Sequence, residues 1–260
     1  MIRVAVVLAP NPGLFTGPGT NTYVIGDEGT VAVIDPGPVI PGHLDAIVGE
    51  IGDRRAAAVL VTHCHPDHAP AANPLGVRLG VPVVGYGPGP DFSPDVTIGD
   101  GEAFTDGGLE VVAVHTPGHT ADHLCYLVGD VLFTGDHIMG GSTVVIEDAA
   151  AYMASLEKVL AVDPRHLYPG HGPELPDARA AVEEYVAHRR LREDQIVEAV
   201  RAGAHSVDEI VAAVYTDVDP TLHLAAALQV RAVLQKLTSE SRLSSRRGTD
   251  EGGSFHALEE

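Results

Sequence analysis

The sequence predicts an α/β protein with substantial antiparallel strand pairing, followed by a small helical domain. Its first half alternates short Val- and Ile-rich runs with turns that contain Gly, Pro, Asn or Asp, which is typical of strands. Helical segments fall between these runs, so strands and helices are mixed along the chain. From residue 188 onward the pattern is helical, which indicates a second module.

The predicted strands follow one another through the first half of the chain. They cover residues 4–8, 22–25, 31–34, 57–62, 81–84, 109–115, 124–128 and 131–134. Gly129 and Asp130 join the last two and favour a tight hairpin. Helices are predicted at residues 43–51, 71–79, 149–162 and 177–201. The last two have apolar residues at the spacing of an amphipathic helix.

We predict a domain boundary at residue 187. Residues 1–187 form the larger domain, and residues 188–240 form a module with helices at 188–201, 206–214 and 222–240. Ser206 followed by Glu209 is typical of a helix start in which each side chain caps the other's backbone. The stretch 241–260 is rich in Ser, Gly and charged residues, and we predict a disordered tail there.

The charge and the apolar pattern restrict the partners. The formal net charge is −20, so a polyanion such as duplex DNA meets a repulsive average field and is disfavoured. No apolar run reaches the roughly 18 residues of a membrane helix. The first ten residues contain a single basic residue and favour a first strand over a signal peptide. We therefore expect a cytoplasmic protein with no membrane contact. Two cysteines do not suggest a disulfide framework.

The run Thr-His-Cys-His-Pro-Asp-His at residues 62–68 carries the strongest chemical signal. It ends a buried strand, and strand alternation places His63 and His65 on one side, with Cys64 pointing away. A turn at the following proline brings the last two polar residues to the same pocket. The candidate ligands of this run are His63, His65, Asp67 and His68.

This cluster favours metal binding over a set of surface histidines. Imidazole and carboxylate are ligands of Zn²⁺ and similar ions. The cluster follows a buried strand, and burying such groups without a metal would be costly. Four ligands exceed what one catalytic zinc needs, so the run predicts two metals that share a site.

Three more candidate ligands follow a glycine near the end of a predicted strand or apolar run. Glycine allows the backbone to turn sharply and to approach closely. Each motif alone is weak, but together and in this order they are specific. The ligands are His119 in Thr-Pro-Gly-His, Asp136 in Phe-Thr-Gly-Asp and His171 in Tyr-Pro-Gly-His-Gly.

The motif order resembles the ligand pattern of the metallo-beta-lactamase-fold hydrolases: His-x-His-x-Asp-His, Pro-Gly-His, Gly-Asp and Gly-His. The resemblance covers residues 10–175 and implies a four-layer αββα sandwich with the metals at one edge of two sheets. It also implies how two metals share the ligands: His63, His65 and His119 on the first, Asp67, His68 and His171 on the second, and Asp136 between them.

A narrower resemblance concerns residues 17–23, 116–123, 135–140 and 148–156, which are similar to the beta-lactamase-like protein 2 group. That group implies a C-terminal winged-helix domain, matching residues 188–240, and its animal members imply endoribonuclease activity on single-stranded RNA. One departure is Ala69-Pro70, where the family usually has Gly-Gly. It predicts that the pocket floor differs.

The residues and the resemblance together predict a metal-dependent hydrolase with two Zn²⁺ per chain, with iron or manganese as alternative metals. A metal-bridging hydroxide would attack an ester-type or phosphodiester bond. Asp67 is the predicted catalytic residue, both as a ligand and as an acceptor of the nucleophile's proton.

Several functions remain open. The alternatives are an endoribonuclease acting on single-stranded RNA and a glyoxalase II-like thioesterase acting on a small molecule. The charge favours a small substrate, and the winged-helix-like module favours nucleic acid. Such a module can also serve protein interaction, which would allow a homodimer. An iron-dependent sulfur dioxygenase ranks lower because the second ligand set is complete. A third hypothesis is a non-enzymatic metal-stabilised scaffold, and the complete ligand set argues against it.

Four residues have a weaker case as substrate-contacting or supporting residues. His123 and His137 either support the ligands by hydrogen bonds or are simply packed or exposed polar residues. Ser142 and Thr143 follow Gly140-Gly141 near the expected mouth, where they either contact substrate or form a turn. Asn21 and Tyr23 are interpreted as structural.

Overall fold

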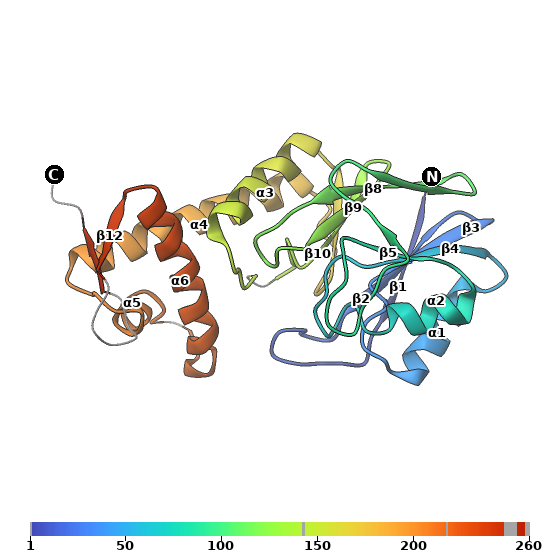
Figure 1. Ribbon diagram of the computed structural model, residues 1–260, viewed down its shortest axis with the longest axis horizontal. Coiled ribbons are helices and arrows are strands. Elements are labelled where there is room, and N and C mark those ends of the chain that lie inside the picture. The colour runs from blue at the N-terminus through green and yellow to red at the C-terminus, as the bar shows by residue number, and fades with distance from the viewer. Residues whose placement is uncertain (1, 142–143, 217, 247–253, 258–260) are drawn as a thin grey trace.

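The computed structural model describes residues 2–141, 144–216, 218–246 and 254–257. Two β-sheets pack face to face, and helices cover their outer sides, as Figure 1 shows. This arrangement confirms the predicted αββα sandwich with a helical C-terminal domain.

The first sheet has six strands in the order β1-β2-β3-β4-β5-β6. They are β1 (Arg3–Leu8), β2 (Asn21–Gly26), β3 (Thr30–Ile34), β4 (Arg55–Leu60), β5 (Val83–Gly85) and β6 (Val96–Thr97). The first three pair antiparallel and the others parallel. Helices α1 (Pro41–Ile51) and α2 (Ala72–Leu79) make the parallel crossovers after β3 and β4.

The second sheet has five strands in the order β11-β10-β9-β8-β7. They are β7 (Ala103–Asp106), β8 (Leu109–His115), β9 (Leu124–Val128), β10 (Val131–Gly135) and β11 (His166–Pro169). Val128 pairs with Val131, so the predicted hairpin is confirmed. Because β10 and β11 are parallel and β8 runs the same way, all three strands end at one edge.

Strand alternation separates two apolar layers in the first sheet. In β4, Ala58 and Leu60 face the second sheet, and Val59 packs towards the helices. All three are fully buried, because this strand is covered on both faces. The layers give the site a rigid support.

The outer side of the second sheet carries α3 (Ala149–Val162) and the first part of α4 (Ala178–Arg201). Tyr152 and Leu156 of α3 are completely buried and belong to the same core as Leu132. That core continues into the C-terminal module, so the sandwich and the module share apolar packing.

The C-terminal module consists of the end of α4, α5 (Val207–Val214), the 3-10 turn η1 (Pro220–Leu222), α6 (His223–Ser239) and two short strands. The predicted capping box at the start of α5 is confirmed, since Ser206 and Glu209 each bond to the other's backbone. The predicted boundary at residue 187 falls inside α4, which is continuous for 24 residues.

The expectation of a disordered tail was wrong for part of residues 241–260. Strands β12 (Leu243–Arg246) and β13 (Ser254–Ala257) pair antiparallel. Leu243 is almost fully buried in the module core, so an apolar anchor overrides the polar composition of this stretch. Within the described ranges, no helix is long and apolar enough to cross a membrane.

Candidate metal centre

The candidate ligands come from four chain segments that end at one edge of the sandwich. The 63–68 run follows β4, and the other three ligands follow β8, β10 and β11. The backbone N–H of Leu124 donates to the carbonyl of Thr62 at 2.8 Å, which ties the two sheets together at this edge. Carboxyl ends of strands with the same direction converge in this way, so distant sequence motifs become neighbours.

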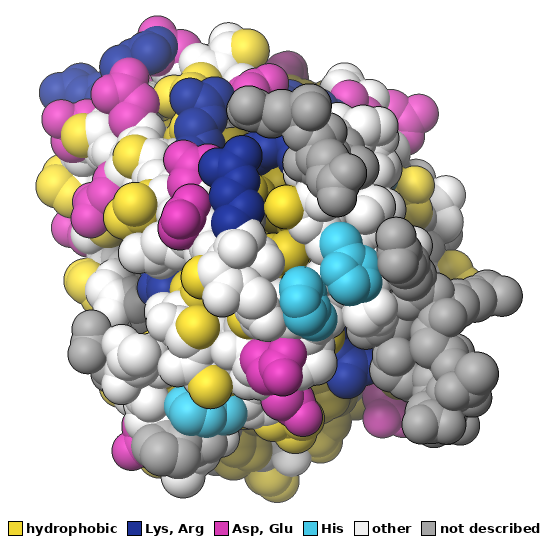
Figure 2. Space-filling model, turned by 90° about the vertical axis from the view of Figure 1, so that its left-hand side faces the viewer, with side chains coloured by type: hydrophobic (Ala, Val, Ile, Leu, Met, Phe, Trp, Pro, Cys, Tyr) yellow, Lys and Arg dark blue, Asp and Glu magenta, His cyan; other side chains and the backbone are white. Residues whose placement is uncertain are grey.

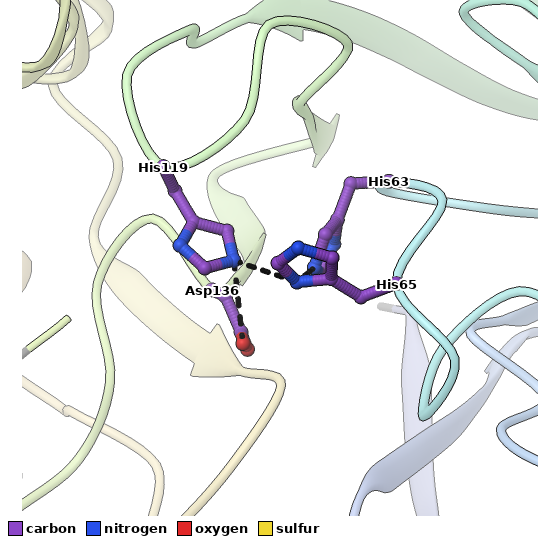
Figure 3. A group of neighbouring side chains, drawn as sticks. All are labelled: His63, His65, His119 and Asp136. Atoms are coloured by element: carbon purple, nitrogen blue, oxygen red, sulfur yellow. Dashed lines mark hydrogen bonds and ion pairs between the residues drawn. The ribbon is translucent and has the colours of Figure 1, made fainter. Parts of the chain in front are cut away.

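The first ligand group contains His63, His65, His119 and Asp136 (Figure 3). Nδ1 of His65 lies 3.0 Å from Nε2 of His63 and 3.1 Å from Nε2 of His119. The ligand atoms of the group all lie within 4.8 Å of one another. Three ring nitrogens and a carboxylate therefore point at one small volume.

The second group contains Asp67, His68 and His171. Nε2 of His171 lies 3.2 Å from Nε2 of His68 and 3.1 Å from Oδ2 of Asp67. The two histidines are buried, whereas the Asp67 side chain is 25% exposed and lines the adjacent cleft. All seven predicted ligands thus lie together, in two neighbouring groups.

Asp136 lies between the two groups. Its Oδ2 is 3.7 Å from Nε2 of His119, and its Oδ1 is 3.4 Å from Nε2 of both His68 and His171. Oδ1 is buried and has no hydrogen-bond partner with good geometry among the described residues. Buried carboxylate oxygens normally have a hydrogen-bond partner, so an oxygen without one is a good candidate for a cation ligand.

The protonation preferences divide the centre into two parts. Burial lowers the pKa of His63 well below its usual value and also lowers that of His65, so both rings are neutral and can offer a lone pair. Burial opposes the charged form of His171, but the carboxylates of Asp136 and Asp67 raise its pKa to about 9. The two carboxylates therefore favour positive charge beside them, which a bound cation would supply.

Asp35 supports both groups and was not predicted. It is buried after β3, and its carboxylate accepts bonds from the backbone N–H and hydroxyl of Thr62 at 2.8 and 2.7 Å. Oδ2 also lies 2.9 Å from Nδ1 of His68, which fixes that ring with Nε2 towards the site. Its signal was the end of the Val31–Ile34 strand followed by Asp-Pro-Gly, since the ligands also follow strand ends.

Asn21 and Tyr23 hold the His171 loop, which refines their structural interpretation. Asn21 donates to the carbonyls of Pro169 and Gly172, and the Tyr23 hydroxyl donates to Pro169 at 2.6 Å. Burial places these bonds out of water, so the loop has a defined position. The side chains therefore determine where His171 lies.

The His119 ring is oriented by a backbone carbonyl. Nδ1 of His119 lies 2.6 Å from the carbonyl oxygen of Val145, so Nε2 faces the ligand group. The preceding Gly118 has φ +132°, and a Cβ there would lie 2.5 Å from the backbone nitrogen of Tyr152. The predicted need for glycine before this ligand has a direct steric cause.

Of the four weaker candidates, one supports a ligand, one is packed in the core, and two lie outside the described residues. His123 is fully buried, and its Nε2 accepts the backbone N–H of Asp136 at 3.1 Å. His137 is fully buried against Tyr152, with ring centroids 4.9 Å apart, and does not line the cleft. Solvent exposure, one of the interpretations given for His137, is therefore wrong. Ser142 and Thr143 lie outside the described residues.

The Ala69-Pro70 departure lies behind the site. Ala69 is fully buried in the core between the first sheet and its helices, and neither residue lines the cleft. The pair is not part of the cleft lining, so its effect on the pocket floor stays a prediction. Cys64 also points away from the ligands, towards Gly87, and burial raises its pKa to about 12.

A cleft of about 800 Å³ opens over the ligand groups. Its floor includes His65, Asp67, His119 and Asp136. Its walls come from the β1–β2 loop and from the C-terminal module, chiefly α6. The module therefore takes part in the site, which the division into two sequence domains did not predict.

The chain matches two described families, the metallo-beta-lactamase superfamily over residues 15–171 and the beta-lactamase associated winged helix domain over residues 206–250. A beta-lactamase-like protein 2 homolog of Drosophila melanogaster is 34% identical over 94% of this chain and 91% of its own. An atrochrysone carboxyl ACP thioesterase of Aspergillus chevalieri is 34% identical over 93% of this chain and 83% of its own.

A solved structure gives the same fold over the whole length. It is a metallo-beta-lactamase family protein of Thermus thermophilus, with a TM-score of 0.79, 19% identity and 98% of both chains covered. The fold, the His and Asp groups at the sheet edge and the sequence matches agree. The chain belongs to the metallo-beta-lactamase superfamily and is a metal-dependent hydrolase with a C-terminal winged helix domain.

Proposed function

We propose that the protein is a dinuclear zinc hydrolase that cleaves a thioester. The observation that carries the proposal is Asp136, whose carboxylate lies between two ligand groups at the floor of one cleft. A single metal would leave one of these groups unused. Two cations placed side by side would use all seven ligands.

The residues fit zinc. Zinc prefers histidine nitrogen and carboxylate oxygen, and the two groups offer these atoms with no thiolate. Because the His63 and His65 rings are neutral, they can bind a metal without first losing a proton. Iron accepts similar ligands, and metal analysis of the purified protein distinguishes the two metals.

The reaction adds water to the thioester carbonyl, breaks the C–S bond and releases a carboxylate and a thiol. Two bound cations would lower the pKa of water and stabilise negative charge on the carbonyl oxygen. Asp67 lines the cleft with a partly exposed carboxylate, so it can accept the proton that water loses. Asp35 keeps His68 in place throughout, because it is buried and bonded at both oxygens.

The bond type is supported by a relative and by the cleft. The Aspergillus protein is named as an ACP thioesterase, and the alignment with it spans both domains. Several cleft residues are apolar, including Leu14, Phe15 and Leu228. An acyl group fits such walls better than a phosphodiester backbone does.

Single-stranded RNA is the second candidate, and the module's surface argues against it. Figure 2 shows basic side chains lying beside acidic ones at this end of the molecule. Lys236 pairs with Glu193 at 2.9 Å, and Arg242 pairs with Asp194 at 3.0 Å. Their ion pairs reduce the charge that these two side chains can offer to phosphates.

Metal analysis and a substrate panel test the proposal. We expect two zinc per chain and hydrolysis of thioesters, but not of lactams, lactones or single-stranded RNA. Asp67→Ala should abolish hydrolysis, whereas Asp45→Ala, a change at an exposed carboxylate of α1, should leave it intact. One iron per chain, or cleavage of RNA but no thioester, would overturn the proposal.

A further inference from the structure

Helix α6 presents different side chains on its two faces. Val230, Val233 and Leu234 are buried in the module core. Residues of α6 that are three or four positions apart line the cleft. They are Ala225, Leu228, Arg231, Ala232 and Gln235. These cleft-lining residues form a fixed wall of the site, which we call the α6 wall, because the opposite face of the helix is packed in the module core.

The β1–β2 loop forms a second apolar wall. Leu14 and Phe15 line the cleft and are 63% and 61% exposed. Figure 1 shows this loop reaching from the sandwich towards α6. Leu228 in the α6 wall is 52% exposed. Large apolar side chains left in water around one cleft indicate a ligand that covers them.

The α6 wall also carries a cation that has no ion-pair partner among the described residues. Arg231 is exposed and forms no ion pair or hydrogen bond with any residue in the described part of the chain. The chain has only 16 Lys and Arg against 36 Asp and Glu, so an unpaired guanidinium is unexpected. Apart from the candidate ligands, Glu147 is the second charged residue among the described residues that line the cleft.

We propose that the cleft binds a thioester with an extended apolar acyl group and one anionic group. The acyl group packs between Phe15 and Leu228, and the anionic group pairs with Arg231. The inference rests on the proposed thioester hydrolysis for its reaction, although binding does not require turnover. Guanidinium groups bind carboxylates and phosphates through paired hydrogen bonds, so either group satisfies the site.

Thioether analogues of the substrate separate binding from hydrolysis, because their C–S bond is not cleaved. Wild-type protein loaded with zinc should bind dodecyl-pantetheine at least tenfold more tightly than butyl-pantetheine in calorimetry, because apolar burial grows with chain length. Leu228→Ser should reduce this preference about tenfold. Leu191→Ser is the matched control, because Leu191 is a 58% exposed leucine of α4 away from the cleft.

Two charged analogues identify the partner of Arg231. One carries a phosphate on the pantetheine side, and the other carries a carboxylate at the end of the alkyl chain. We expect one of them to bind about tenfold more tightly than the neutral analogue, and Arg231→Met to remove that gain. Arg190→Met, which removes an exposed arginine of α4 outside the cleft, should retain it.

The outcomes distinguish the inference from the proposed function. Equal binding of short and long analogues, or an unchanged charge preference in Arg231→Met, would overturn the inference even if thioesters are hydrolysed. The predicted binding pattern without thioester turnover would support the inference and overturn the proposed reaction.

Discussion

The guanidinium of Arg189 donates a hydrogen bond to the carbonyl oxygen of Val144 at 2.6 Å. The next carbonyl along the chain, that of Val145, lies 2.6 Å from the His119 ring. Arg189 also donates to Gln229 of α6, whose amide reaches the same Val144 carbonyl at 3.0 Å. The module thus holds the segment that orients a candidate ligand.

Arg189→Met should destabilise the protein by about 3 kcal/mol, because it removes two buried charge-assisted bonds and leaves the Gln229 side-chain oxygen without its donor. Urea unfolding measures the change. Arg190→Met, at the exposed neighbouring position, should stay within about 0.5 kcal/mol of wild type. Equal stability of the two variants would show that the Val144 contact is not important.

Asp35→Asn should weaken zinc binding by about 10- to 100-fold, because an amide cannot accept bonds at both side-chain positions and the His68 ring loses its orientation. Competition with a chelator of known affinity measures this. Asp27→Asn changes an exposed aspartate that caps a turn, and its zinc affinity should match wild type. If the Asp35→Asn variant bound zinc as tightly as wild type, Asp35 would not support the metal ligands.

Gly170→Ala should lower the zinc content of the purified protein. An added Cβ would lie 2.7 Å from Oδ1 of Asp136 and 2.7 Å from Cε1 of His68, so both groups must move. The control is Gly49→Ala in α1, where a Cβ has no contact within 4 Å. That change should keep full zinc content and add about 0.5–1 kcal/mol of stability through helix propensity. Full zinc content in both variants would contradict the steric prediction.

Removal of the metals should lower the melting temperature. A ligand present at about 1,000 times its Kd stabilises the folded state by about 4 kcal/mol, which corresponds to roughly 8–16 °C for a chain of this size. Scanning calorimetry with and without a chelator measures the shift. Asp136→Ala should reduce the shift, because it removes the carboxylate between the groups. A chelator without effect on wild type would count against tight binding.

The sequence was most informative where chemistry and strand endings coincide. His119 and His171 could be found because each follows an apolar run and a glycine turn, and His63 because it directly follows the buried strand predicted at residues 57–62. The helices at residues 149–162 and 177–201 were predicted closely because their apolar periodicity is long. Some short strands, such as Val96–Thr97 and Ala103–Asp106, lack such a pattern and were missed.

The supporting contacts could not be predicted, since they join residues far apart in sequence. Val145 acts through a backbone carbonyl, which has no residue signature. Arg189 lies in a helix beside other arginines, and only packing shows that it is buried. The cleft likewise depends on how α6 meets the β1–β2 loop, a tertiary arrangement that no local pattern encodes.

Helix α4 has a consequence for how the chain folds and could be divided. Its first turns pack on the sandwich, its last turns pack on α5 and α6, and no flexible linker separates them. The two parts should therefore melt together in one cooperative transition. A catalytic fragment that stops at residue 187 would end in a severed helix and expose apolar core, so it would aggregate rather than act as a free domain.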